Sequence, residues 1–272
     1  MFKINNLTYK YDKNRKALDN VTMDFDKGDI IGIIGSNGSG KSTLFNNLMG
    51  ILKDTEGEIL YKNNRLKYDK KSLYNLRKEV GIVFQDPDKQ IFYSMVYDDL
   101  AFAMRNIGMN EKTIKKRIYK ALEAVKGEDF IDRPVHSLSF GQKKRVTIAS
   151  ILVLNPKVLI LDEPTAGQDY YHYSEIMNFL KELNEQGQTI VLITHDMHLM
   201  LEYTPRAIVL CNGEKIADQK AYEILCNEQI CEKANLKETS LFTLAKKAEI
   251  EDPVQFVEKF IQFEKERKAY EN

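Results

Sequence analysis

Cysteine, net charge and long apolar runs are all scarce in this sequence. Its 272 residues contain three cysteines, an odd number without paired zinc-ligand spacing, which is typical of free thiols in a reducing compartment such as the cytoplasm. Lys plus Arg and Asp plus Glu each total 40, so the formal net charge is zero and the basic footprint of a nucleic-acid-binding protein is absent. No stretch approaches the roughly 18 apolar residues that span a bilayer, and the first residues lack a signal core. We therefore expect a cytoplasmic chain with no nucleic-acid partner, and any membrane role would have to come through a partner protein.

A glycine-rich stretch follows a short run of branched apolar residues at 30–34. The run is apolar on both faces, which is typical of a central strand in a parallel sheet. Gly35, Gly38 and Gly40 allow positive φ and bring backbone N–H groups close to an anion. The helix expected to begin at Lys41 turns the positive end of its dipole toward the same point. The Gly-x4-Gly-Lys-Ser spacing is specific, and it predicts a cradle for the β- and γ-phosphates of a nucleotide.

The residues expected to hold the nucleotide here are consecutive in the chain. They are Ser36, Asn37, Gly38, Ser39, Gly40, Lys41, Ser42 and Thr43.

Further apolar runs predict strands of the same sheet, and they lie at 81–84, 158–161, 190–193 and 207–210. The last of these would be the final strand. Polar side chains follow three of the runs: Gln85 after the first, Asp162 and Glu163 after the second, and His195 after the third. In doubly wound sheets, ligand sites lie beyond the carboxyl ends of the strands. We therefore expect these side chains to gather at the edge of the sheet that carries the glycine-rich loop.

Each of these polar residues has an expected role. Ser42, Gln85 and Asp162 would hold Mg²⁺. Side chains alternate along a strand, so Asp162 and Glu163 would point different ways and divide their work. Glu163 would then polarise the attacking water as general base, and Gln85 would orient that water and sense the γ-phosphate. His195 would hydrogen-bond the γ-phosphate and keep the water in line.

The rest of the chain predicts three accessory parts. Alternating residues at 2–25 and 57–61 predict a small antiparallel sheet, on which Tyr9 or Tyr11 can stack on a nucleotide base. The residues from about 86 to 155 are helical in pattern, and Ser139 is placed to cap a helix whose first-turn amides form a second anion site. The last segment, from about residue 220, is helical and polar with an apolar stripe that should dock on its own chain or on another.

Together these motifs resemble those of ABC-transporter ATPases. The matching segments occur in the family's order over residues 1–220, and they are the Walker A stretch 35–43, the Q-loop Gln85, the signature 138–142, the Walker B segment 161–164, the D-loop 167–169 and the switch histidine His195. The resemblance implies an α/β P-loop NTPase fold with a RecA-like parallel core sheet and an antiparallel β subdomain. It also implies an inserted α-helical signature lobe at about 86–155 and a C-terminal helical extension at 221–272.

Within this family, the segment 83–92 and the C-terminal extension resemble the ATPases of energy-coupling-factor and cobalt/nickel importers. The resemblance implies a head-to-tail dimer with a second ATPase, identical or paralogous, in which Ser139, Gly141 and Gln142 of one subunit reach the γ-phosphate bound to the other. Tyr11 matches the aromatic residue that stacks on adenine. The implied partners are a transmembrane coupling protein and a membrane substrate-binding subunit, the implied location is peripheral on the cytoplasmic face of the membrane, and the extension would hold the two ATPases together.

Two residues depart from the family pattern. Phe140 replaces the first glycine of the usual signature pair, and Gln168 stands where the D-loop usually has leucine. A degenerate cassette that binds ATP without hydrolysing it is therefore one alternative, although Glu163 and His195 are intact. A second alternative is an ABC ATPase that acts on DNA or ribosomes. It predicts a long coiled coil before the signature, or two cassettes with basic extensions, and these 272 residues show neither pattern.

Overall fold

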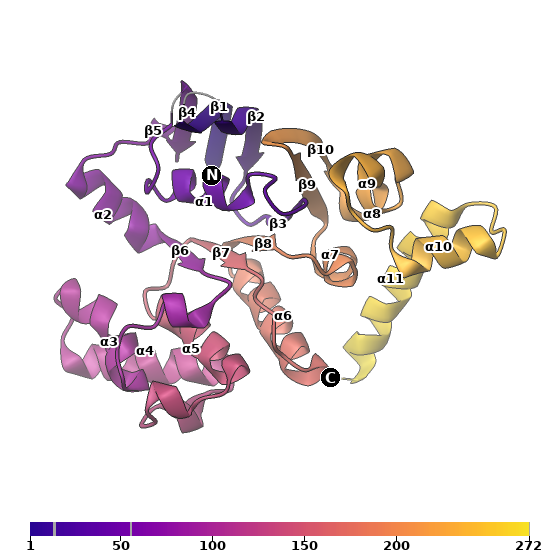
Figure 1. Cartoon of the computed structure of the whole chain (residues 1–272). Helices are drawn as coiled ribbons and strands as arrows, with labels where there is room; N and C mark the ends of the chain where they lie inside the picture. The colour runs from indigo at the N-terminus through magenta and orange to yellow at the C-terminus, as the bar shows by residue number, and fades with distance from the viewer. Residues whose placement is uncertain (13–14, 55, 272) are drawn as a thin grey trace. The chain divides into compact units, whose positions relative to one another are not determined.

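The computed structural model describes residues 1–12, 15–54 and 56–271 and divides into two compact units (Figure 1). The first unit comprises Met1–Asp26, Ile30–Tyr68 and Ile193–Asn272. The second comprises Lys27–Asp29 and Asp69–Leu192. No helix among the described residues is long and apolar enough to cross a membrane.

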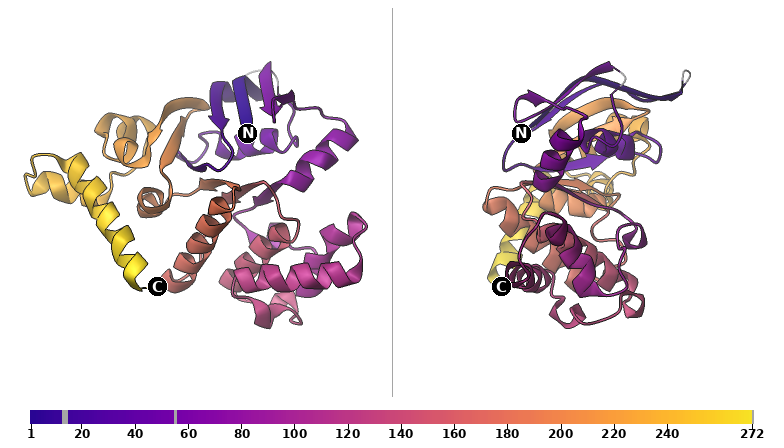
Figure 2. Two further views of the ribbon diagram at one scale, coloured as in Figure 1. Left: turned by 180° about the vertical axis from the view of Figure 1, so that it is seen from behind. Right: turned by 90° about the vertical axis from the view of Figure 1, so that its left-hand side faces the viewer.

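The first unit opens with an antiparallel sheet in the order β2-β1-β4-β5. Its strands are β1 (Phe2–Asp12), β2 (Arg15–Phe25), β4 (Glu56–Tyr61) and β5 (Asn64–Arg65). Phe2 pairs with Phe25, and alternation along β1 buries Phe2 and Ile4 on one side. Leu7 is buried as well, after a shift of register between Ile4 and Leu7. Figure 2 shows these strands side by side with helix α1 (Lys41–Leu48) next to them. The antiparallel sheet predicted from the sequence is confirmed.

Strand β3 (Ile30–Ile34) pairs in parallel with β9 (Arg206–Cys211) in the same unit. After β9 the chain reverses at Asn212 and Gly213, both with positive φ (50° and 84°), and returns as the antiparallel strand β10 (Glu214–Lys220). The prediction that 207–210 is the final strand is therefore wrong. The sequence predicted a turn at Asn212-Gly213 but not the strand that returns from it, although an Asn-Gly pair favours the two-residue turns of hairpins.

The C-terminal segment is helical, as predicted, and packs on the first unit. Its helices are α8 (Ala221–Leu225), α9 (Glu228–Ala234), α10 (Ser240–Lys247) and α11 (Pro253–Glu271). Val257 and Ile261 of α11 are buried in one core with Ile34 of β3 and Val209 of β9. The apolar stripe thus docks on its own chain, as one of the two expectations had it.

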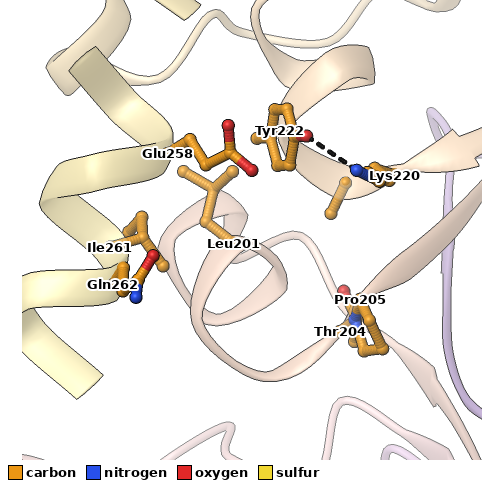
Figure 3. A pocket seen from close by; sticks show the side chains of 9 residues that line it. Leu201, Thr204, Pro205, Lys220, Tyr222, Glu258, Ile261 and Gln262 are labelled. Atoms are coloured by element: carbon orange, nitrogen blue, oxygen red, sulfur yellow. Dashed lines mark hydrogen bonds between the residues drawn. The ribbon is translucent and has the colours of Figure 1, made fainter. Parts of the chain in front are cut away.

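Helix α11 does not bury all of its apolar side chains. Phe260 and Phe263 stay 36% and 59% exposed. Figure 3 shows Glu258, Ile261 and Gln262 of α11 at a cavity of about 390 Å³, across from Leu201 of α7 (Met197–Tyr203). Helix α11 therefore packs on the unit through Val257 and Ile261 and leaves Phe260 and Phe263 accessible to solvent.

The second unit carries the other three of the five predicted parallel strands. In the order β8-β7-β6, these are β6 (Val80–Val83), β7 (Val158–Asp162) and β8 (Thr189–Ile193, of which residues through Leu192 belong to this unit). The helices that accompany them are α2 (Lys70–Glu79), α3 (Val96–Asn106), α4 (Glu111–Ala124), α5 (Phe140–Leu152) and α6 (Tyr170–Glu185). Ile114, Ile118 and Leu122 of α4 are fully buried, which confirms the apolar stripe read from the sequence.

Candidate functional site

The glycine-rich loop joins β3 to α1 as the sequence predicted. Gly40 precedes the helix with φ 106°, and a Cβ at this position would lie 2.6 Å from the carbonyl oxygen of Ala17, so only glycine fits. No side chain caps the first turn of α1, which leaves its N–H groups available to an anion. The ammonium of Lys41 donates to the carbonyl oxygens of Gly35 (2.6 Å) and Ser36 (2.9 Å). The loop therefore combines open amides with a cation held at its centre.

The end of β9 fixes this loop from behind. A Cβ on Gly35 would lie 2.2 Å from the carbonyl oxygen of Leu210, so the two backbones touch. The N–H of Gly213 donates to the carbonyl oxygen of Ser39 (3.0 Å). Both contacts involve main-chain atoms, so the loop keeps its shape independently of side-chain rotamers.

His195 lies beside the loop in the first unit. A pocket of about 500 Å³ is lined by Gly35, Ser36 and Asn37 together with His195, and also by four residues from further along the chain: Met197, Asn235, Leu236 and Lys237. Asp196 caps α7 by accepting from the N–H groups of His198 (2.9 Å) and Leu199 (3.1 Å), and it thereby sets where the chain leaves β8. The structure thus brings His195 and the start of the loop to one pocket.

Tyr11 stands next to the first turn of α1. Its hydroxyl lies 3.2 Å from the hydroxyl of Thr43, and its ring is 57% exposed. The ring of Tyr9 meets it edge-on, with ring centroids 5.0 Å apart, and supports it from behind. Tyr11 therefore offers an open aromatic face near the loop, which is what stacking on a base requires.

We expect Tyr11→Ala to weaken ATP binding by about tenfold, because base–aromatic stacking contributes about 1–3 kcal/mol. Tyr11→Phe keeps the ring and should bind within about twofold of the parent. Titration calorimetry with ATP measures both. Equal affinities for the parent and the alanine variant would show that the base stacks elsewhere.

Lys144 organises the candidate site in the second unit, although no motif singled it out. It lies on α5 with 0% exposure, and its ammonium donates to the carbonyl oxygens of Phe84 (2.8 Å), Gln85 (3.0 Å) and Asp162 (3.1 Å). Burial lowers the pKa of Lys144 to about 8, against the opposing effect of nearby carboxylates, of which Asp162 is the strongest. This one side chain therefore ties the Q-loop and the Walker B strand to the signature helix.

Gln90 makes a second tie between the same elements. Its amide nitrogen donates to the carbonyl oxygen of Thr147 (3.0 Å) on α5, and its amide oxygen accepts from the N–H of Phe84 (3.0 Å). Gln85 follows Phe84 and is exposed. The structure thus holds the backbone of Gln85 firmly and leaves its side chain accessible.

Asp162 ends β7, and Glu163 is the first residue beyond the strand. Glu163 has φ 47°, a left-handed conformation that is uncommon for residues other than glycine. The argument that strand alternation separates the two carboxylates is therefore wrong for Glu163, because a turn, not the pleat, sets its direction. Unusual backbone conformations of this kind concentrate at functional sites.

Ser139 caps α5, as predicted. Its hydroxyl oxygen accepts from the N–H of Gln142 (3.3 Å), and the amide oxygen of Gln142 accepts from the N–H of Ser139 (3.0 Å). The first-turn amides of α5 are therefore not all bare, which corrects that part of the prediction. The Ser139 hydroxyl has accepted one bond and still has its own proton to donate to a phosphate oxygen.

The two residues that depart from the family pattern lie at one contact in the second unit. The amide of Gln168 donates to the carbonyl oxygen of Gly141 (2.9 Å). A Cβ on Gly167 would lie 2.5 Å from the ring of Phe140, so the ring and the glycine backbone touch. The signature and the D-loop of one chain are thus joined by the side chains that distinguish this sequence.

The predicted site residues divide between the units. Tyr11, the loop residues 36–43 and His195 belong to the first unit, while Gln85, Asp162, Glu163 and the signature residues belong to the second. In the first unit Tyr11 contacts Thr43, and His195 shares a pocket with Ser36 and Asn37. In the second unit Lys144 joins the backbones of Gln85 and Asp162. Their assembly around one triphosphate stays a prediction.

Comparison with known proteins identifies the family. Residues 18–166 match the family model described as ABC transporter. The chain is also 49% identical over 265 residues, 97% of its length, to a putative ABC transporter ATP-binding protein of Clostridium perfringens. This chain belongs to the ABC transporter family. Its P-loop NTPase fold and its ATPase domain follow from that membership.

Two solved structures extend the comparison. The cbiO1 protein of Clostridium perfringens, described as part of the ABC transporter complex cbiONQ, is 42% identical with a TM-score of 0.78 and covers 92% of this chain and 98% of that one. An ATP-binding cassette solved as a dimer in a post-hydrolysis state with ADP and Pi is 32% identical with a TM-score of 0.75, over 81% of this chain and 99% of that one. The chain covers 46% of the putative ABC transporter ATP-binding protein of Clostridium perfringens to which it is 49% identical. It therefore spans about half the length of the curated relatives it matches.

Proposed function

We propose that this chain is the ATP-hydrolysing subunit of an importer of the energy-coupling-factor type, and that it drives uptake of a vitamin or of cobalt or nickel ions. The observation that carries the proposal is the similarity to cbiO1 over 92% of the chain, because that protein is part of a cbiONQ transporter complex. The family shown by the comparisons supplies the ATPase chemistry. The importer class, the substrate and the peripheral location at the cytoplasmic face of the membrane belong to the proposal.

The proposed reaction is hydrolysis of ATP between two cassettes. The loop 36–43 binds the phosphates, Tyr11 stacks on the base, and Ser139, Gly141 and Gln142 of a second cassette, identical or paralogous, close on the γ-phosphate. Glu163 accepts a proton from the attacking water while the oxygen of that water bonds to the γ-phosphorus. The bond from that phosphorus to the bridging oxygen breaks, and its electron pair leaves with ADP. His195 holds the γ-phosphate and the water in line.

The residues proposed for Mg²⁺ fit this ion chemically. Ser42, Gln85 and Asp162 all present oxygen atoms, which are the ligands that Mg²⁺ prefers. Ser42 is exposed at the first turn of α1, and Lys144 fixes the backbone of both Gln85 and Asp162. When bound, the ion would neutralise phosphate charge.

An exposed aromatic surface in the second unit supports docking to a membrane protein. Phe92 is 80% exposed, and Tyr93 and Phe102 are 43% and 41% exposed with their ring centroids 5.3 Å apart. Asp99 fixes the segment by accepting from the N–H groups of Phe92 (2.8 Å) and Tyr93 (3.1 Å). A rigid, exposed aromatic group is typical of a protein interface. We propose that a transmembrane coupling protein docks here.

The test is recovery of the affinity-tagged chain from solubilised cell membranes, with the bound proteins identified by mass spectrometry. The proposal expects a second ABC ATPase, a compact transmembrane coupling protein and a substrate-binding subunit. Phe92→Asp should lose the membrane proteins, and Tyr119→Asp, a 46% exposed aromatic residue on α4, should retain them. Recovery of ribosomes or DNA in place of membrane proteins would contradict the proposal.

A further inference from the structure

The pocket beside the glycine-rich loop (the phosphate loop below) contains residues from the C-terminal segment that no motif indicates. Asn235, Leu236 and Lys237 connect α9 to α10 and line the pocket together with Ser36 and His195. A helical extension whose only role is to join two subunits has no need to reach the phosphate loop. Joining two subunits therefore does not explain why Asn235, Leu236 and Lys237 lie in this pocket.

The backbone holds the start of this segment close to the loop. Leu210 touches Gly35 through its carbonyl oxygen, as described above. The next residue, Cys211, is 7% exposed and donates from its Sγ to the carbonyl oxygen of Lys233 (3.2 Å) on α9. The end of β9 thus contacts the glycine-rich loop through Leu210 and the end of α9 through Cys211.

The turn after α9 is equally well defined. Asn235 ends the helix in the left-handed conformation (φ 54°), which asparagine tolerates better than most residues. The N–H of Leu236 donates to the carbonyl oxygen of Cys231 (2.8 Å). The N–H of Asn235 also donates to the carbonyl oxygen of Glu232 (3.1 Å), so the backbone that leads into Lys237 is held by two hydrogen bonds.

The charge of the pocket favours an anion. Its lining contains the lysine Lys237 and the histidine His195 but no aspartate or glutamate. Lys246 on α10, by contrast, pairs with Glu228 and Glu238, so its charge is compensated. Lys237 has no such ion pair among the residues that the structure describes. Loop amides, a histidine and this ammonium together match the terminal phosphate of a nucleoside triphosphate.

We propose that Lys237 is a further nucleotide-binding residue, contributed by the C-terminal segment to the terminal-phosphate side of the site. The inference rests on the proposed function, since it takes ATP as the ligand and His195 as the neighbour of the γ-phosphate. Lys237 contacts ATP and does not reach ADP, which ends one phosphate earlier. Binding of ATP is thereby coupled to the position of the C-terminal helices.

The experiment measures the affinity of the purified transporter complex for ADP and for a non-hydrolysable ATP analogue by titration calorimetry. We expect Lys237→Ala to bind the analogue about fivefold more weakly, because an exposed charge-assisted contact contributes about 1 kcal/mol. Affinity for ADP should stay within about twofold of the parent. Lys237→Arg should restore the analogue's affinity, and the loss should shrink as salt is added. Lys233→Ala, an exposed lysine of the same segment outside the pocket, is the matched control.

Two further results separate the possible failures. Unchanged analogue affinity in Lys237→Ala, or an equal loss for the analogue and ADP, would overturn the inference and leave the proposed function standing. Lys41→Ala is the reference for the proposed function itself, because unchanged analogue affinity there would show that the glycine-rich loop does not bind the nucleotide. The thermal midpoint of each variant shows whether it is folded.

Discussion

Replacing Glu163 by glutamine should lower the steady-state ATPase rate of the assembled complex by at least about a hundredfold. A positioned general base contributes about 10²–10⁴ in rate, and the amide of glutamine cannot take the proton from water. Glutamine keeps the size and the left-handed backbone of Glu163, so folding should not change. ATP binding should be retained, because the phosphates are held by the glycine-rich loop. The measurement is phosphate release at saturating ATP, with affinity measured separately.

Glu182→Gln is the matched control for this prediction. Glu182 is an exposed carboxylate on α6 in the same unit. Its variant should hydrolyse ATP at the parent rate. Continued hydrolysis at the parent rate by Glu163→Gln would remove Glu163 from the role of base. A complex in which neither the parent nor any variant hydrolyses ATP would favour the degenerate-cassette alternative.

Replacing Lys144 by methionine should reduce the free energy of unfolding by about 3 kcal/mol near pH 7.5. The change leaves three carbonyl oxygens without their shared donor, and each buried unsatisfied group costs about 1–3 kcal/mol. The variant no longer has to bury a charged ammonium, and this gain keeps the net loss of stability below the sum of the three carbonyl terms. Urea unfolding of the purified chain measures the difference. Lys143→Met, which breaks only the partly exposed ion pair with Asp88, should cost less than about 1 kcal/mol.

The loss of stability caused by Lys144→Met should also depend on pH. Its pKa is lowered from 10.5 to about 8 in the folded chain, so between these values the unfolded chain binds the proton and the folded chain does not. The free energy of unfolding therefore rises with pH between 8 and 10.5 because of Lys144. This gain in stability is lost again as the pH falls toward 8. The stability difference between the parent and Lys144→Met should grow by about 2 kcal/mol from pH 7.5 to pH 10. A difference that is constant or shrinks would show that Lys144 does not release its proton in the folded state.

The sequence predicted those features that depend on local pattern. Branched apolar runs gave the strands β3, β6, β7, β8 and β9, and the glycine spacing gave the loop and the start of α1 at Lys41. Ser139 was identified as a cap because capping requires a short polar side chain directly before a helix. These signals lie within a few residues of the structure they specify.

The features that the sequence did not reveal depend on contacts distant along the chain. Lys144 stands in a Lys-Lys-Arg run that looks like a solvated helix face, and only its position four residues before Ile148 on the buried side of α5 was a usable signal. The direction of Glu163 was wrongly derived because the strand ends one residue before it. The approach of Lys237 to the phosphate loop depends on the packing of α9 on β9, for which a single sequence gives no pattern.

The contact between Gln168 and Gly141 has a consequence for how two cassettes would work together. In the proposed head-to-tail pair, Gly141 would border the nucleotide held by the partner, whereas Gln168 lies five residues after Glu163, the proposed general base at the chain's own nucleotide. A change at either residue would therefore move the other through this hydrogen bond. If two such chains pair as proposed, the state of one nucleotide would affect the groups that contact the second.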